Sequence, residues 1–288
     1  MRKRIITLLL SPMLLLAMVA LMPTNTFAAS QHHAPHFFVK GSRFAGNNLA
    51  YHGGPVMNGT ANVYAIFWEP TGAVQSNYNS LILRYFNDVN GQGLYHINTQ
   101  YHDSAGRYPS AEHLVTSWVD TGAYPESPLL DSDIQSEVSR AQRANGWSSS
   151  IHNIFFVFLQ SNQDLCFDSS YSQCASNTFC AYHNYFGSST IYSAMPYAAS
   201  FYCNPGSSPN NNDADQTINV TSHEQMEAAT DPLLNAWYDS SGNENGDKCA
   251  WTFGPLNSSG GDVSWNGHSY IVQKEWNNHI SGCSLTGP

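Results

Sequence analysis

The chain has 288 residues, of which 42% are hydrophobic and 13% aromatic, so it is long and apolar enough to form one large folded domain. Only 11% of the residues are charged, and acidic side chains outnumber basic ones, which gives a formal net charge of −10 at pH 7. This composition excludes an intrinsically disordered chain. It also argues against binding to nucleic acid or anionic membranes, because both require clustered Lys and Arg.

The N-terminal residues are typical of an export signal. Met1–Arg4 is basic, Ile5–Met22 is almost wholly apolar, and Thr26–Ala28 supplies the small residues that a signal peptidase reads. The alternative is an uncleaved membrane anchor, because the apolar stretch approaches spanning length. We expect a signal peptide at residues 1–28 and a secreted, extracellular or cell-wall-associated mature chain without stable membrane insertion. The sequence does not predict the oligomeric state.

Regular apolar patterns begin at about Tyr51. Residues 29–50 are therefore expected to form a linker or short pro-segment, and residues 51–288 a single domain. β-branched and aromatic content, alternation and apolar runs predict the strands. These are Asn62–Trp68, short segments around Tyr95–Tyr101 and His113–Val119, the central strand Ile154–Leu159, and the segments Phe179–Phe186 and Ile191–Tyr197.

Three segments have the spacing and end signals of helices. They are Ser76–Asn90, a second helix from Ser132 or Asp133 to Asn145, and a third from Asp213 or Asp215 to Thr230. An amphipathic segment, His268–His279, lies near the C-terminus. Strands and helices that alternate in this way predict an α/β (α+β) layered domain with helices packed on one mixed sheet.

Six cysteines are present, an even number that indicates disulfides in an exported chain. Six cysteines allow fifteen pairings. We favour sequential pairing, because each such pair brackets a loop-rich stretch. The cysteines lack the CxxC spacing of a zinc site, which argues against a role for them as metal ligands. The favoured pairs are Cys166 with Cys174, Cys180 with Cys203, and Cys249 with Cys283.

The third helix contains the sequence His223-Glu224-Gln225-Met226-Glu227. His223 and Glu227 are four residues apart, so their side chains leave one helical face and can hold one ion. Glu224 points elsewhere, as a general base does in the HExxH helix of zinc peptidases. Glu244 is the first choice for a third ligand, with Asp247 or Asp239 as alternatives, and we expect Zn²⁺.

Two other interpretations remain open. Ligands rich in oxygen also suit manganese or calcium, and a glutamate in place of the second histidine makes the site neutral and the ion a weaker Lewis acid. Acids in a glycine- and asparagine-rich turn are also commonly just solvated.

The residues predict two functions of different classes. The first is a secreted metal-dependent hydrolase, a zinc peptidase with Glu224 as general base that acts on a peptide or cell-wall-associated substrate. His183 is a weak candidate for its oxyanion partner. The second is a non-catalytic extracellular or cell-wall-associated interaction protein with a structural metal. Glu224 favours the enzyme, because a structural site needs no acid between its ligands.

Several motifs in order resemble the phosphate-induced protein 1 family, whose members are EXORDIUM-like secreted proteins. The resemblance covers residues 51–288 and implies an extracellular or wall-associated protein with a zincin-like domain, linked in plants to cell growth, without a settled reaction. Ala181 and Asn245 depart from the family pattern beside the predicted site. The segments that carry the resemblance are Tyr51–Val56, Val63–Trp68, Cys174–Phe186, Ala194–Ala198, His223–Pro232, Asn235–Tyr238, Glu244–Cys249 and Ile271–Cys283.

Overall fold

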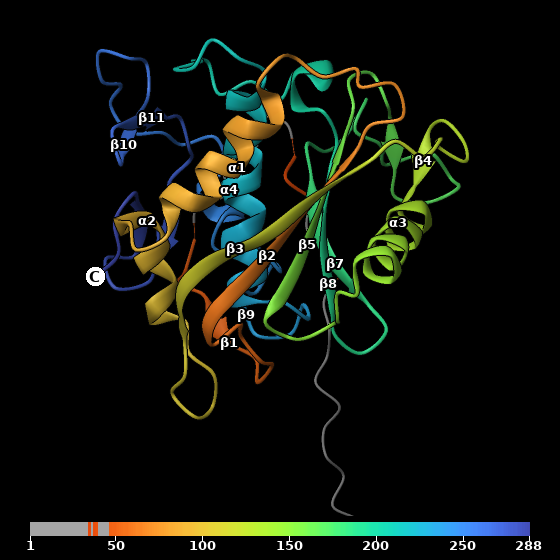
Figure 1. Ribbon diagram of the computed structural model, residues 1–288. Helices are drawn as coiled ribbons and strands as arrows, with labels where there is room; N and C mark the ends of the chain where they lie inside the picture. Colours follow the sequence, from red (N-terminus) through yellow and green to blue (C-terminus); the bar gives the residue numbers. More distant parts are fainter. Residues whose placement is uncertain (1–33, 36, 40–45) are drawn as a thin grey trace, which may run out of the picture.

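A computed structural model describes residues 34, 35, 37–39 and 46–288, so the expected signal peptide at residues 1–28 lies outside the described residues. A five-stranded sheet runs through the centre of the molecule in the order β3-β2-β5-β8-β7 (Figure 1). Four strands are parallel, and β7 pairs with β8 in the antiparallel sense. The predicted mixed sheet is thereby confirmed. The strands are β2 Gly59–Trp68, β3 Pro109–Asp120, β5 Asn153–Leu159, β7 Tyr182–Phe186 and β8 Thr190–Met195.

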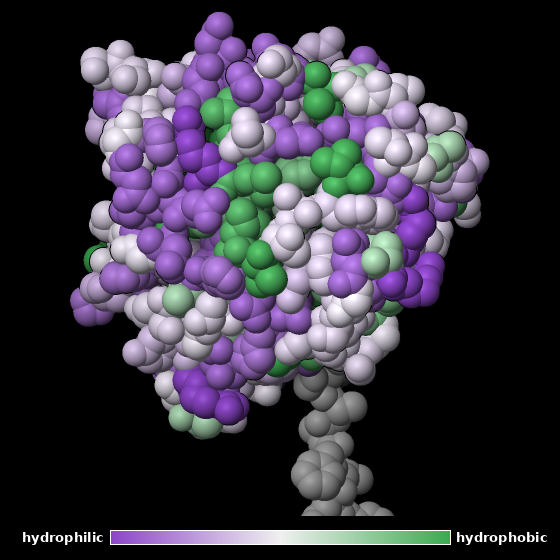
Figure 2. Space-filling model, viewed as in Figure 1, coloured by the Kyte–Doolittle hydropathy of each residue, from purple (hydrophilic) through white to green (hydrophobic). Residues whose placement is uncertain are grey.

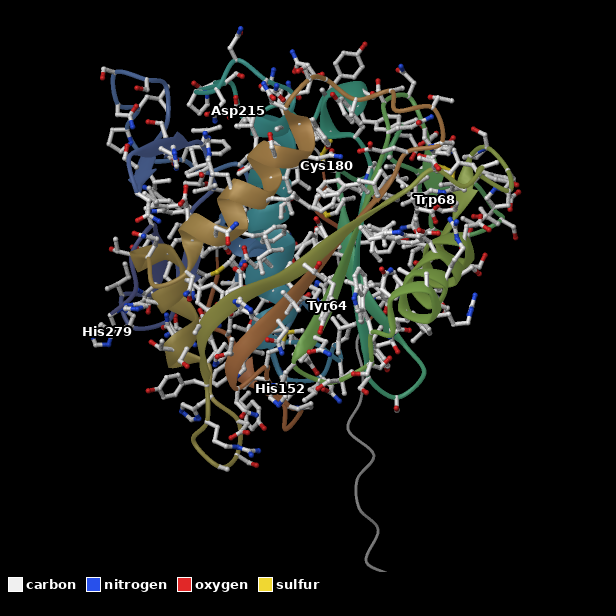
Figure 3. The ribbon with its side chains drawn as sticks, viewed as in Figure 1. Tyr64, Trp68, His152, Cys180, Asp215 and His279 are labelled. Atoms are coloured by element: carbon white, nitrogen blue, oxygen red, sulfur yellow. A yellow bond between two sulfur atoms is a disulfide. The ribbon has the colours of Figure 1, made fainter. Side chains whose placement is uncertain are left out.

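Helices cover both faces of the sheet (Figure 1). Helices α1 (Tyr78–Val89) and α4 (Ala214–Thr230) lie on one face and α3 (Asp131–Asn145) on the other, close to the three predicted ranges. Figure 3 shows Trp68 of β2 beside α3, where the Arg140 guanidinium lies 5.3 Å from the centre of its ring. The domain is therefore a three-layer α+β structure.

Local signals account for where the helices begin and end. The Asp133 carboxylate accepts the Leu130 N–H at 2.7 Å, which satisfies a backbone donor at the start of α3. Gly146 ends the same helix with a φ of 72°, and Gly91 has a φ of 73° just beyond α1. Only glycine adopts this left-handed conformation without steric cost.

The core lies on both faces of the central strand β5, all seven of whose residues are buried. Phe156 and Phe158 face α1, and their rings meet Phe86 with centroids 5.1 and 6.5 Å apart. Phe155 faces the other way and packs against Tyr64, with 5.1 Å between the ring centres. The continuous apolar run of β5 thus reflects a strand covered on both sides.

One predicted strand was wrong. The segment Tyr95–Tyr101 lies mainly in the short helices α2 (Gly93–His96) and η1 (Ile97–Gln100). Tyr95, Ile97 and Tyr101 are spaced as on one face of a strand. However, Leu94 and Asn98, which would lie on the opposite face, are buried too, and this pattern suits consecutive helical turns better than a strand with one exposed face. The other short helices are η2 Ala198–Phe201 and η3 Asp247–Cys249.

Among the described residues, four two-stranded pairings lie outside the main sheet. Two of them, β10–β11 and β12–β13, include half of the segment predicted to be amphipathic. The pairs are β1 Ala50–Tyr51 with β9 Trp237–Tyr238, β4 Leu129–Leu130 with β6 Leu165–Cys166, β10 Val263–Trp265 with β11 His268–Tyr270, and β12 Glu275–Asn277 with β13 Gly282–Ser284.

Disulfides brace the loops, as the cysteine count predicts. The pairs are Cys166–Cys174, Cys180–Cys203 and Cys249–Cys283, so the sequential hypothesis is confirmed. Cys180, labelled in Figure 3, lies near the middle of the molecule, two residues before β7. Three disulfides fit an oxidising compartment. In the described part of the chain, none of the helices combines the length and apolar character that crossing a membrane requires.

Strand β3 forms one edge of the sheet and crosses the face of the molecule that Figure 1 presents. Figure 2 shows apolar side chains gathered in the middle of this face. Val115 and Val119 of β3 are 39% and 49% exposed. The strand pairs on its inner side with β2, so its outer backbone groups form an edge of the kind at which other chains can add.

Candidate metal centre

Helix α4 is almost wholly buried although much of it is polar. It packs against α1, β7 and β8, and sixteen of its seventeen residues are buried. Thr217 and Gln225 bond the hydroxyls of Tyr78 and Tyr85 on α1, at 2.7 and 2.6 Å. A buried helix normally presents apolar residues on every side, so polar groups within it need partners of this kind.

The predicted motif on α4 converges on one point. His223 Nε2 lies 3.0 Å from Glu227 Oε1. His223, Glu224 and Glu227 each direct one donor atom into a group whose members lie within 4.8 Å of one another. All three side chains are fully buried. The spacing of four residues thus brings His223 and Glu227 together, and Glu224 lies closer to them than the motif alone indicates.

His183 of β7 belongs to the same cluster, because α4 packs against that strand. Its Nδ1 lies 3.6 Å from Glu224 Oε2 and 3.7 Å from Glu227 Oε2. Its Nε2 lies 3.7 Å from Glu244 Oε1. His183, Glu227 and Glu244 therefore form a second group of donor atoms within 4.8 Å, which shares Glu227 with the first. Glu244 contacts His183 in this group rather than His223.

The segment before η3 closes the cluster from another side. The Asp247 N–H donates to Glu227 Oε1 at 2.9 Å, and Asp247 Oδ1 lies 3.8 Å from His223 Nε2. A Cβ on Gly246 would stand only 2.7 Å from His223 Nδ1 and 2.9 Å from Glu227 Oε1. Only glycine allows the backbone to approach the histidine this closely.

Gln273 orients the imidazole of His223. Its carboxamide nitrogen lies 3.0 Å from His223 Nδ1 and donates to the Gly246 carbonyl at 2.9 Å. Nε2 is therefore the ring nitrogen that faces the acids. A carboxamide nitrogen donates, so this contact holds the ring with Nδ1 as the acceptor, which differs from the Nδ1–H donation usual for a metal-binding histidine.

The cluster fits a cation by a test that does not depend on the motif. Burial of a polar or charged group without a partner is costly, so native proteins rarely contain several such groups side by side. Here seven fully buried atoms have no hydrogen-bond partner among the described residues and crowd into one region. They are His183 Nδ1, His223 Nε2, Glu227 Oε2 and both carboxylate oxygens of Glu224 and Glu244.

The pKa values reflect the same crowding. Burial lowers the pKa of both histidines, but neighbouring carboxylates outweigh it and raise the pKa of His223 to about 10 and that of His183 well above its usual value. Burial raises the pKa of Glu224 to about 7 and that of Glu244 well above normal. Burial also acts to raise the pKa of Glu227, but the two histidines outweigh it and lower that pKa to about 2. Protons occupy positions that a cation would take, so cation binding would release protons.

The remaining predicted acids have other partners. Asp239 accepts hydrogen bonds from Asn243 and lies 3.2 Å from the Lys248 ammonium. The Asp231 carboxylate, just beyond the end of α4, accepts the backbone N–H groups of Asn235 and Ala236, each at 2.6 Å.

A third group of potential donors, Asp164 with Cys166 and Cys174, is not a metal site because these two cysteines form a disulfide. Among the clustered residues, the sequence underestimated His183, which was only a weak candidate for another role. A histidine three residues after Cys180, just inside a predicted strand, was the available signal.

Comparisons with known proteins give one relevant match. The chain is 24% identical to Protein EXORDIUM-like 5 of Arabidopsis thaliana over 82% of this chain and 77% of that protein. This match supports the resemblance to EXORDIUM-like proteins. No protein-family profile and no solved structure matches the chain.

Proposed function

We propose that the chain is a secreted metal-dependent hydrolase, a zinc peptidase that acts on a peptide or cell-wall-associated substrate. The observation that carries the proposal is the set of buried atoms without a hydrogen-bond partner on His183, His223, Glu224, Glu227 and Glu244, whose nearest polar neighbours are one another. In a tetrahedral zinc shell, neighbouring donor atoms are about 3.4 Å apart. The contacts of Glu227 with His223 and His183, at 3.0 and 3.7 Å, are close to this spacing, and each uses a different oxygen of Glu227.

In this proposal His223, Glu227 and Glu244 would hold the metal, with His183 as a further donor; Glu227 belongs to both groups of donor atoms, whereas Glu244 lies beside His183. When bound, the ion supplies a Lewis acid that polarises the carbonyl of the scissile bond. Glu224 takes a proton from the attacking water at a carboxylate oxygen. Two glutamates and neutral histidines neutralise a divalent ion, which favours slow turnover.

Export is part of the proposal. The three disulfides and the signal-like N-terminus support a secreted chain, and the similarity to an EXORDIUM-like protein is consistent with it.

A second function, a non-catalytic wall-associated protein with a structural metal, is favoured by one observation. The side chains of the cluster are fully buried, and structural zinc sites are closed, whereas catalytic sites keep an open position. In this alternative Glu224 has no role in catalysis, so its replacement would not change any hydrolysis measured in the preparation.

One experiment separates the two functions. The secreted chain is purified, its metal content is measured, and hydrolysis of a mixed peptide library is followed. Glu224→Gln should retain the metal and lose about 10²- to 10⁴-fold in rate, whereas His223→Ala should lose the metal. Glu126→Gln, at an exposed glutamate, is the matched control and should change neither. A Glu224→Gln protein that hydrolyses as fast as the parent would refute the enzyme.

A further inference from the structure

Residues far from the cluster in sequence cover it in space. The segment Phe37–Val39, which we call the covering segment, runs antiparallel to the chain that leads into β7. The Phe38 N–H donates to the Ala181 carbonyl at 3.1 Å, and the Cys180 N–H donates to the Phe38 carbonyl at 2.7 Å. Val39 forms an isolated bridge with Phe179. The covering segment is thus bound as an extended peptide through its backbone.

The side chain of Phe38 occupies a slot between two rings. Its ring stacks on His223 with centroids 4.1 Å apart and planes at 7°, and on Trp251 with centroids 4.6 Å apart and planes at 25°. Phe38 is fully buried. The aromatic side chain therefore lies directly against a predicted metal ligand.

Trp251 holds the covering segment at a second point. Its indole Nε1 donates to the Val39 carbonyl at 2.8 Å. The backbone of Trp251 has a φ of 57°, a conformation that is costly for a bulky residue. Backbone strain of this kind collects at binding sites, where the surrounding structure maintains it.

We propose that the covering segment is an internal occupant of the substrate groove. The groove takes an extended peptide, pairs its backbone with residues 179–181, and inserts an aromatic side chain between His223 and Trp251. Backbone pairing of this type supplies affinity independent of sequence, and a side-chain slot supplies specificity. The chain thereby competes with its own substrate. The inference rests on the proposed function, because it assigns a substrate class to the same site.

The geometry accounts for the closure of the site. Phe38 covers His223, and its tether to the folded domain maintains a high local concentration of the covering segment. A substrate with an aromatic residue must displace it. The segment lacks a disulfide of its own, and its attachment consists of hydrogen bonds and ring contacts, which open locally without unfolding of the domain.

The test uses the full secreted chain loaded with Zn²⁺. The rate of zinc transfer to EDTA is measured for the parent, for Phe38→Ala and for Trp251→Phe, which retains a ring but loses the hydrogen bond to Val39. Phe38→Ala should release zinc about ten- to a hundredfold faster, because the burial of one phenylalanine side chain corresponds to that change in an opening equilibrium. Trp251→Phe should show a smaller increase in the rate of zinc release, and it provides the test if Phe38→Ala does not fold.

Phe186→Ala is the control, since it removes the same side chain from the far end of β7 and should release zinc at the parent rate. A synthetic peptide with the sequence of residues 34–39 is then added to Phe38→Ala. It should slow zinc release and inhibit peptide hydrolysis, whereas the same peptide with alanine for Phe38 should do neither. Peptides with aromatic residues should be the preferred substrates of Phe38→Ala.

The outcomes separate the two claims. Parent-like zinc release from both Phe38→Ala and Trp251→Phe, or a peptide without effect on Phe38→Ala, overturns the covering-segment proposal. A chain that retains no zinc in any variant overturns the metal site, and this inference with it. A chain that holds zinc but hydrolyses no peptide refutes the hydrolase, while the release and peptide measurements still determine whether the segment is an exchangeable occupant.

Discussion

Removal of the Cys249–Cys283 disulfide should destabilise the protein more than removal of Cys166–Cys174. The first joins residues 34 positions apart and the second residues 8 positions apart. A cross-link restricts the unfolded chain, and its stabilising effect grows with the logarithm of the loop length. The loop-entropy relation gives about 3.8 kcal/mol for the long loop and about 2.5 kcal/mol for the short one at 25 °C.

The free energy of unfolding is measured by guanidinium titration of the two double Cys→Ala variants, with tryptophan fluorescence as the probe. The long-loop variant should be less stable by about 1 kcal/mol relative to the short-loop variant. Equal losses, or a larger loss in the short-loop variant, would show that native packing rather than unfolded-chain entropy governs these bonds.

The same two variants test whether the segment around η3 belongs to the candidate metal centre. Cys249 ends η3, two residues after Asp247 and five after Glu244, so its bond fixes the segment that completes the cluster. Zinc affinity should fall when Cys249–Cys283 is removed and stay unchanged when Cys166–Cys174 is removed. Equal affinity in both variants, by competition with a fluorescent zinc indicator, would contradict this assignment.

Three further predictions concern single side chains. Glu112 is buried without a hydrogen-bond partner for either carboxylate oxygen among the described residues, and burial raises its pKa well above the usual value. A raised carboxyl pKa destabilises the folded state as pH rises from about 4.5 through the folded-state pKa, so Glu112→Gln should be more stable by about 1–3 kcal/mol at pH 7. The gain should vanish in unfolding titrations below about pH 4.5; a gain that persists there would refute the charge argument. Gly246→Ala should weaken zinc binding because its Cβ meets His223 and Glu227, whereas Gly282→Ala, where the nearest atom is 3.8 Å away, should not; isothermal titration compares the two. Gln273→Leu should lower zinc affinity about 10- to 100-fold with little change in fold by circular dichroism, and an unaltered affinity would remove Gln273 from the site.

Most of the fold could be predicted from local patterns. Six of the seven buried residues of β5, Ile154–Leu159, form a continuous apolar run, and α4 was predicted almost to its ends because Asp231-Pro232 stops the helix. The segment Tyr95–Tyr101 was mistaken for a strand, because short apolar stretches fit both the strand and the helix period and only tertiary burial decides between them.

The candidate site was predicted only in part, for a physical reason. His223 and Glu227 are brought together by the helix itself, so their spacing in the sequence is informative. His183 reaches them only because β7 packs beside α4, and Phe38 only because the covering segment folds back across the molecule. Contacts of this kind depend on the tertiary arrangement and leave no periodic trace in one sequence.

The complete burial of the cluster affects how preparations of the protein behave. Its side chains have no contact with bulk solvent, so an ion enters or leaves only when the structure above it opens. Samples folded with and without zinc, then brought to the same buffer, will therefore differ in occupancy until that slow opening has occurred. If the cluster binds zinc as proposed, the metal content of a freshly purified sample will therefore record the medium in which the chain folded rather than the medium in which it is assayed.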